Sequence, residues 1–282
     1  MKAKALTNAF LSCAVALALV ASLGISTPAF AGTITCGALC RIEVSIAGGP
    51  PVDVPLSVDE HGVGHLAGPF SKTTDGVTLS LDSATLSPDP AIIFAASATN
   101  LTGGPVLFTF VFATPIALSG TIDAASSIGY TLTDGFPAGL GGSPGVTLSS
   151  GLGTDPTHVL VANDVGPTPP GVIVNKGVDV GPFLTDPPGG IPGVCTPFTP
   201  GAAATSTCGP FSAANTFSGG PFVLMTTTLS FVLSPEDSAG FSGSVVEQPH
   251  SSVPEPPTLL LMVSGLLGLG LGVGWRRYWL RA

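Results

Sequence analysis

Glycine and proline divide this chain into segments of strand length, and this division restricts its fold more than any other feature. The 282 residues include 38 glycines and 28 prolines. Glycine weakens helices and proline breaks them, so long helices are disfavoured over most of the chain. The segments between these residues are rich in Val, Ile, Thr and Phe, which favour strands. We therefore expect an all-β body.

Several segments also show the alternation of half-buried strands. Residues 42–46 and 77–82 alternate apolar and polar side chains, and Phe108, Phe110 and Phe112 fall on one face, as a core-facing strand requires. Strands are predicted at 41–46, 52–58, 77–86, 91–98, 106–113, 116–122, 128–132, 159–162, 222–233 and 238–247. Turns are expected at 87–90, 100–105, 133–135 and 234–237.

This spacing predicts one antiparallel β-sandwich or jelly-roll-like domain over residues 32–247. The Gly- and Pro-rich stretch between the 159–162 and 222–233 strands is expected to be a long excursion. The strands that follow it are too few for a core of their own. We therefore expect them to complete the same sandwich.

The charge balance of this body excludes two classes of partner. Between residues 32 and 250 there are three basic residues, Arg41, Lys72 and Lys176, against sixteen acidic ones, which leaves a net charge of −13. Neutralising phosphates takes clustered Lys and Arg. Binding to nucleic acid or to an anionic membrane surface is therefore not expected.

The N-terminus reads as a secretory signal peptide over residues 1–31. Lys2 and Lys4 precede an apolar stretch at 10–23, which is expected to be helical, and Ala29-Phe-Ala31 supplies small residues before a cleavage site. Cleavage is predicted between Ala31 and Gly32. The body should then leave the cytoplasm through the Sec export machinery.

The C-terminus carries the pattern of a single transmembrane helix. Residues 258–275 contain no charge and would span roughly 27 Å as a helix, close to the thickness of a bilayer core. A Pro-rich spacer at 248–257 precedes this helix, and a basic tail at 276–282 follows it. Arg276 and Arg277 favour a cytoplasmic end, so the body would lie on the other side.

Val253-Pro254-Glu255-Pro256, a short Leu- and Gly-rich helix and a terminal arginine cluster resemble the PEP-CTERM sorting signal of exported bacterial proteins. The resemblance covers about thirty residues and departs from the pattern at Pro257 and in the broken arginine cluster. It implies recognition of Pro254, Glu255, Pro256, Arg276 and Arg277 by exosortase, a membrane transpeptidase that is thought to cut near the motif. The alternative is an ordinary membrane anchor behind a stiff spacer.

Four cysteines, Cys36, Cys40, Cys195 and Cys208, follow the expected cleavage site. An exported chain meets an oxidising compartment, so two disulfides are predicted. Three pairings are possible. The local one, Cys36 with Cys40 and Cys195 with Cys208, is favoured because the second pair brackets a twelve-residue loop without predicted strands. A tetrathiolate zinc site would need C-x-x-C spacing, which the sequence lacks.

Residues 59–65 hold the metal-ligand types Asp59, Glu60, His61 and His65. The two glycines between the histidines argue against a helix that would place both imidazoles on one face. In a strand the two histidines would still share a face. A solvated turn is the favoured interpretation, and no metal site is predicted.

Two further motifs have the residue types of a functional site. Ser143 stands in a G-x-S-x-G string at 141–145, with Asp155 and His158 following in order. A nucleophile elbow needs a strand before the serine and a helix after it, whereas here a Gly-rich stretch precedes and Pro144 follows. Asn100 begins an N-x-T string, which we interpret as a turn residue.

No catalytic residue and no cofactor are predicted. Tyr130 is the only tyrosine outside the tail, and both tryptophans lie in the tail, so a sugar-stacking cleft is not expected.

We expect a non-enzymatic exported protein with a structural or adhesive role at the cell surface or in the extracellular polysaccharide matrix, with that polysaccharide as a candidate partner. Two alternatives stay open: a secreted polysaccharide-active or hydrolytic enzyme using loop carboxylates or Ser143, and a polysaccharide-binding module with calcium at Asp59 and Glu60.

Overall fold

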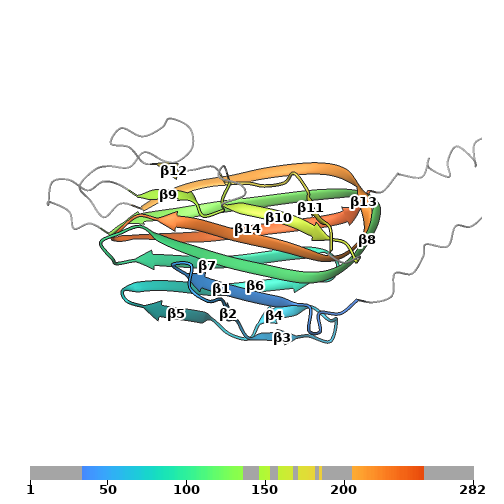
Figure 1. Ribbon diagram of the computed structural model, residues 1–282, viewed down its shortest axis with the longest axis horizontal. Coiled ribbons are helices and arrows are strands. Elements are labelled where there is room, and N and C mark those ends of the chain that lie inside the picture. Colours follow the sequence, from blue (N-terminus) through green and yellow to red (C-terminus); the bar gives the residue numbers. More distant parts are fainter. Residues whose placement is uncertain are drawn as a thin grey trace, which may run out of the picture. The chain divides into compact units, whose positions relative to one another are not determined.

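In the computed structural model, fourteen strands join into one antiparallel sheet that folds over on itself as a β-sandwich (Figure 1). The structure describes residues 34–135, 146–152, 158–167, 171–181, 184–185 and 205–250. These ranges contain no helix, so none there is long and apolar enough to cross a membrane. The all-β prediction is confirmed. The helices predicted within 1–31 and at 258–275 lie outside the described residues.

The strands alternate with short turns for most of the chain. They are β1 (Arg41–Ile46), β2 (Val52–Asp53), β3 (Leu56–Val58), β4 (Gly64–Leu66), β5 (Phe70–Thr74), β6 (Val77–Ser87), β7 (Ala91–Asn100), β8 (Val106–Asp134), β9 (Thr147–Ser150), β10 (Leu160–Val165), β11 (Ile173–Asn175), β12 (Leu184–Thr185), β13 (Thr205–Leu233) and β14 (Asp237–Pro249). β14 pairs with both β7 and β8. The late strands therefore complete the early sheet, as predicted.

Two strands of 29 residues, β8 and β13, run side by side through both layers of the sandwich. Residues 106–118 of β8 pair with β1 on one side and with the C-terminal half of β13 on the other. Residues 120–134 pair instead with β14 and with the N-terminal half of β13. The first layer thus contains β1, β2 and β9 to β12, together with residues 106–118 of β8 and the C-terminal half of β13. The second layer contains β3 to β7 and β14, together with residues 120–134 of β8 and the N-terminal half of β13.

The change of layer occurs at glycines. Gly120 has φ +86° and Gly220 has φ +99°, a backbone region that L side chains rarely adopt. The β8–β13 register also shifts between Gly219 and Phe222, and such bulges let a strand bend from one sheet into another. These glycines are therefore corner residues, and they do not interrupt the strands.

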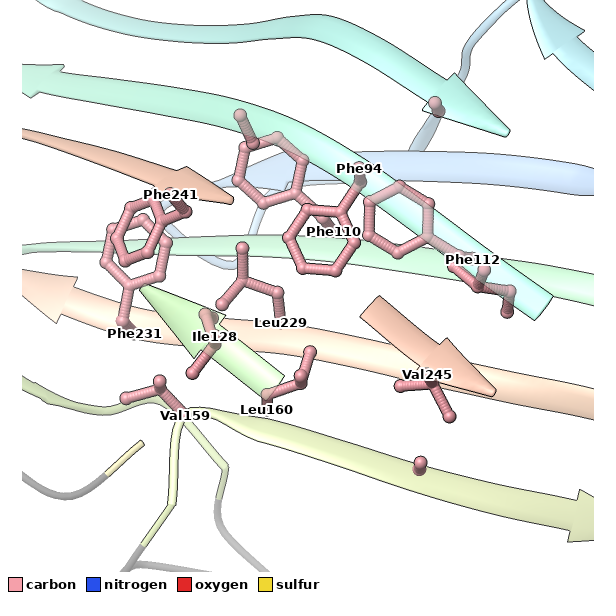
Figure 2. Close-up of a cluster of buried hydrophobic side chains, with 14 of the residues drawn as sticks. Phe94, Phe110, Phe112, Ile128, Val159, Leu160, Leu229, Phe231, Phe241 and Val245 are labelled. Carbon is pink, nitrogen blue, oxygen red and sulfur yellow. The ribbon is translucent and has the colours of Figure 1, made fainter. Parts of the chain in front are cut away.

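The core lies between the two layers and is aromatic (Figure 2). Phe94 of the second layer stacks on Phe112 of the first, with ring centroids 4.7 Å apart, and Phe231 and Phe241 make a similar contact at 4.4 Å. All four rings are buried. Burying each such side chain contributes roughly 1.5–3 kcal/mol. The phenylalanines therefore form the core, as their alternation predicted.

Gly243 shows how closely this core is packed. It pairs with Phe94 across β14 and β7, and a Cβ at this position would lie 2.5 Å from the Phe94 ring. Glycine is therefore needed here because the ring lies over the backbone of β14.

Three strand predictions were wrong. Residues 52–58, predicted as one strand, form the separate strands β2 and β3. The separate strands at 106–113, 116–122 and 128–132 are one strand, and residues 205–221, expected to belong to a loop excursion, form the N-terminal half of β13. In β8, Pro115 resembles a turn signal and residues 123–127 hold no large apolar side chain, whereas residues 205–221 contain several Gly and Pro that resemble turn signals. In addition, residues 205–220 are mostly exposed, so they show no apolar alternation from which a strand could be recognised.

The aromatic contact between the layers generates a stability prediction. Phe112→Ala should lower the free energy of unfolding by about 3–5 kcal/mol, because it removes a fully buried ring and leaves a cavity. Urea denaturation measures the change. Ile93→Ala, at a side chain that is 51% exposed on β7, is the control and should stay within about 0.5 kcal/mol of the wild type. Equal losses in the two variants would contradict the proposed core.

Candidate functional site

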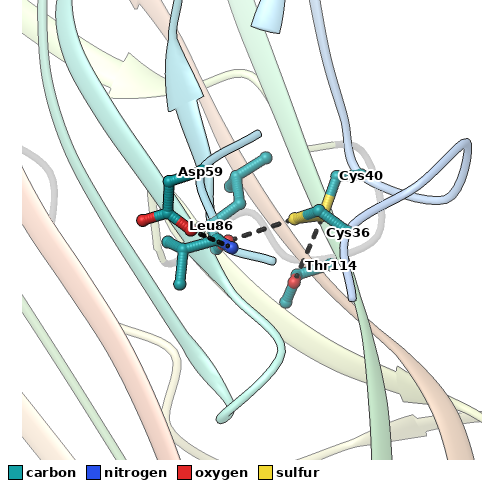
Figure 3. The surroundings of a disulfide bond; sticks show 6 residues. Cys36, Cys40, Asp59, Leu86 and Thr114 are labelled. Atoms are coloured by element: carbon teal, nitrogen blue, oxygen red, sulfur yellow. Dashed lines mark hydrogen bonds between the residues drawn. A yellow bond between two sulfur atoms is a disulfide. The ribbon is translucent and has the colours of Figure 1, made fainter. Parts of the chain in front are cut away.

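A disulfide between Cys36 and Cys40 closes a short loop just before β1, which confirms the first half of the local pairing (Figure 3). Cys36 is fully buried, and its sulfur lies 3.2 Å from the carbonyl oxygen of Leu86. Thr114 lies 3.6 Å from the Cys40 sulfur. The disulfide therefore packs against β6 and β8, while the covalent bond itself lies within the N-terminal segment. Cys208 on β13 is also disulfide-bonded, but Cys195 lies outside the described residues, so the second pairing remains a prediction.

Residues 59–63 form a turn organised by the carboxylate of Asp59 (Figure 3). Asp59 accepts hydrogen bonds from the backbone N–H groups of His61 and Val63, both at 2.9 Å, and lies 3.1 Å from Nε2 of His65. The Val63 bond, followed by His65, lowers the pKa of Asp59. The turn interpretation is therefore confirmed.

The glycines of this turn have steric roles. Gly62 has φ +78°, and a Cβ at Gly64 would lie 2.9 Å from the Cys36 sulfur. His61 contacts Glu60, whereas His65 contacts Asp59. No group of three or more His, Cys, Asp or Glu able to hold a metal occurs within the described ranges.

Of the two remaining sequence motifs, the structure describes Asn100 but neither Ser143 nor Asp155. Ser143 and Asp155 of the G-x-S-x-G hypothesis lie outside the described residues, so that hypothesis stays untested. Asn100 is fully buried; its amide donates to the carbonyl oxygens of Gly104, Leu233 and Ser234 at 2.8 to 3.0 Å. Asn100 is thus a structural turn residue.

The outer face of the second layer consists mostly of small side chains, with Ile93 and Val246 as larger exposed ones, and we call it the small-residue face. Outward positions alternate with the buried ones on β6, β7, β8, β13 and β14. They include Thr78, Ser80, Ala95, Ser97, Thr99, Ser238, Gly240, Ser242, Ser244, Ala125, Ser127, Gly129, Thr131, Thr133, Thr207, Ser212, Ala214 and Ser218. Asp82 and Asp123 are the acidic residues on these described strands that face outward. The face is thus hydroxyl-rich and nearly uncharged.

Hydroxyl groups on this face pair across the strands. Oγ of Ser127 lies 3.1 Å from that of Ser244, and Thr133 and Thr205 are also 3.1 Å apart. A hydroxyl has one donor and two acceptor positions. Each paired hydroxyl therefore keeps hydrogen-bonding capacity for a ligand.

Two open hollows lie on the small-residue face. One, of about 540 Å³, is lined by Ala125, Ala214 and Val246 and bordered by Asp123 and Thr216. At its border Thr216 donates to Asp123 at 2.6 Å, and Nδ1 of His250 lies 2.9 Å from the same carboxylate; these contacts, with Thr216 first, lower the pKa of Asp123.

The second hollow, of about 490 Å³, spans β6, β7, β14, β8 and β13 above Gly129 and Gly240. Small residues are frequent in the lining of both hollows, Ala in the first and Gly and Ser in the second. Tyr130 borders the second hollow but is only 1% exposed, and its burial raises its pKa. Its ring is therefore not presented to solvent.

A charged cluster lies inside the sandwich, where all three of its side chains are 0% exposed. The Nζ atom of Lys176 lies 2.8 Å from Oδ1 of Asp164 on β10 and contacts Oε1 of Glu247 on β14. Burial raises the pKa of Asp164 and raises that of Glu247 to about 7, while Lys176 acts in the opposite direction. The sequence analysis missed this cluster, because its three members are far apart in the chain. The sequence does offer one indication: each of the three is a single charged residue in a largely apolar, strand-like segment.

The sequence matches no protein-family model and no curated protein. Among solved structures, the chain is similar to the adhesin domain of Epf from Streptococcus pyogenes, with 10% identity and a TM-score of 0.30. The match covers 74% of this chain and 58% of that one, so this chain spans less than two thirds of that structure. A likeness of this strength carries no conclusion about function.

Asp237, at the start of β14, gives a pH prediction. Burial raises its pKa to about 6; Ser234 donates to its carboxylate and opposes this, while Asp134 and Glu236 add repulsion. The folded chain therefore binds the proton more tightly than the unfolded chain, whose value is near 3.8. The free energy of unfolding should thus fall as pH rises from about 4 to about 6, and Asp237→Asn should remove this part of the decrease.

The measurement is urea denaturation of both proteins across this pH range. Asp82→Asn, at an exposed position on β6, is the matched control and should follow the wild-type profile. Parallel profiles for Asp237→Asn and the wild type would show that Asp237 does not titrate as described.

Proposed function

We propose that this chain is an exported bacterial surface or extracellular-matrix protein, sorted through its PEP-CTERM-like tail, whose body is a non-catalytic structural or adhesive domain. The small-residue face is the observation that carries the proposal for the body. It is the outer face of a continuous sheet, it has hydroxyls across five strands, and it contains two open hollows. Such a face provides many weak hydrogen bonds, which suits contact with a polymer more than chemistry at a single point.

The partner proposed for this face is extracellular polysaccharide. Sugar hydroxyls are donors and acceptors, as are the Ser and Thr hydroxyls of the face. Affinity would come from the repetition of contacts along a chain, because each hydrogen bond contributes only about 0.5–1.5 kcal/mol net. The net charge of −13 for residues 32–250 keeps such a body soluble and disfavours strongly acidic polymers.

The enzymatic and calcium-dependent alternatives have less support. The hydrolase hypothesis rests on Ser143 and Asp155, which lie outside the described residues. For calcium, the Asp59 carboxylate already accepts two backbone hydrogen bonds inside its turn. Neither alternative gains an assembled set of ligands or catalytic groups from the described part of the chain.

The sorting proposal predicts a defined C-terminus. In the native host, the protein from surface and medium fractions should end near Pro254 to Pro257, as mass spectrometry of its C-terminal peptide can show. Replacing Pro254 and Pro256 by alanine should leave Arg276 and Arg277 on the chain and retain it in the membrane fraction. Pro257→Ala, outside the tripeptide, is the control and should be processed normally. A wild-type chain that still carries Arg276 would support a permanent anchor instead.

The adhesive proposal predicts that blocking the small-residue face weakens binding. Ala125→Glu places a bulky charged side chain in a hollow and should reduce binding of the processed protein to polysaccharide purified from the host by about tenfold or more, equivalent to about 1.4 kcal/mol. Co-sedimentation measures the binding. Thr228→Glu, on the outer face of the first layer, is the matched control. Equal binding by both variants and the wild type would exclude this face as the contact.

A further inference from the structure

We propose that Lys176 and Asp164 condense to form an intramolecular amide bond inside the sandwich, with Glu247 as the proton-transfer residue. The bond would join the side chain of Asp164 on β10 to that of Lys176, the residue that directly follows β11. The inference concerns a covalent modification and does not depend on what the outer face binds.

The three side chains meet because of the fold. Asp164 occupies an inward position of β10, opposite Met225, and Glu247 occupies an inward position of β14, opposite Ala124. Leu160 lies on the same inner face of β10 as Asp164, and Val245 lies on the same inner face of β14 as Glu247. Figure 2 shows Leu160 and Val245 pointing into the space between the layers. Lys176 enters this space from the edge, and its Nζ atom lies 2.8 Å from Asp164 and in contact with Glu247.

As an ion cluster this site is poorly satisfied. By distance and angle together, neither Nζ of Lys176 nor any carboxylate oxygen of Asp164 and Glu247 has a hydrogen-bond partner among the described residues. Taking charges out of water costs several kcal/mol per ion unless well-aligned hydrogen bonds compensate. A neutral amide carries no such cost. The geometry therefore brings an amine and a carboxyl into contact in a place where burial raises the pKa of the carboxyl and so favours its uncharged form.

The reaction balances without any external reagent. A proton passes from the ammonium group of Lys176 to the Asp164 carboxylate, which leaves a free amine and a carboxylic acid. The Nζ lone pair attacks Cγ of Asp164, while protonated Glu247 donates its proton to the carboxyl oxygen. Glu247 then removes a proton from the nitrogen and returns it to the departing hydroxyl group. As water leaves, the remaining hydroxyl on Cγ gives its proton back to Glu247 and becomes the amide carbonyl. The C–N bond forms, the C–OH bond breaks, one water leaves, and Glu247 ends protonated as it began.

Glu247 is suited to this role because its burial favours the protonated form near neutral pH. A carboxylic acid whose pKa is close to the working pH can both donate and accept a proton. An amine removed from water is likewise a better nucleophile than a hydrated ammonium group. Burial between the layers accounts both for the raised pKa of Glu247 and for the removal of the Lys176 amine from water.

The backbone around Lys176 is held in place before any reaction. Gly177 has φ +65° and its N–H donates to the side chain of Asn175 at 2.7 Å. Asn215 of β13 donates to the carbonyl oxygen of Lys176 at 2.7 Å, and Ser126 of β8 donates to that of Val178. Fixed reacting groups can behave as if at very high local concentration. This arrangement therefore positions the amine without the need for an enzyme.

The test uses the exported protein as purified, reduced and denatured. Its intact mass should be lower than that of the unmodified chain by one water molecule. Between residues 32 and 250 trypsin can cut only after Arg41, Lys72 and Lys176. Cleavage after Lys72 should be complete, which serves as an internal control, whereas cleavage after Lys176 should be lost because its side chain is acylated. Fragmentation of the uncut peptide, which begins at residue 73 and contains both residues, should place the link between Asp164 and Lys176.

Two variants sharpen the assignment. Asp164→Asn would form the same amide with loss of ammonia, so its cross-linked product should have the same mass as the wild-type product. Glu247→Gln keeps the shape of the side chain but removes the transferable proton, so the chain should keep its full mass and be cut after Lys176. Trypsin cleavage after Lys176 in the wild-type protein, together with full mass, would overturn the proposal. A link to Glu247 would overturn the assignment to Asp164.

Discussion

The structure depends on two strands that belong to both layers at once. β8 and β13 pair with each other over nearly their whole length and change partners at the corner near Gly120 and Gly220. The inner faces of the two layers are therefore continuous, and aromatic rings such as Phe94 and Phe112 can pack across the space between them. Removing either strand would separate the layers and expose the core. The Cys36–Cys40 disulfide and the buried charged cluster add local contacts at the edges of the sandwich that these two strands form.

Continuity of the sheet also explains the contrast between its faces. The inward positions of the second layer bear Phe, Tyr, Ile, Leu and Val, whereas its outward positions bear Ser, Thr, Ala and Gly. Core packing accounts for the first set. Solubility alone would be met by charged residues, yet the outward positions of the described strands carry few of them. A neutral, hydroxyl-rich face of this extent is therefore the part of the body for which packing gives no explanation.

Sequence reasoning succeeded where one side of a strand faces the core. Residues 41–46 were predicted with the bounds that the structure shows, because their apolar positions alternate. The same reasoning failed at residues 205–221, an exposed half of β13 whose glycines and prolines resemble loop signals. It also divided β8 into three, because Pro115 resembles a turn signal and residues 123–127 hold no large apolar side chain. The Cys36–Cys40 pair and the turn at Asp59 were predictable because their contacts are local.

The sequence by itself determined the strand class, the local turns, the charge balance and the expected signals at both ends, because each depends on neighbouring residues or on composition. Only the tertiary structure decided that Asp164, Lys176 and Glu247 meet and that the small side chains of five strands form one surface. Pairing between strands distant in sequence is set by register and by packing of the whole core. No local pattern carries that information, since alternation shows which face of a strand is buried but not which strand lies against it.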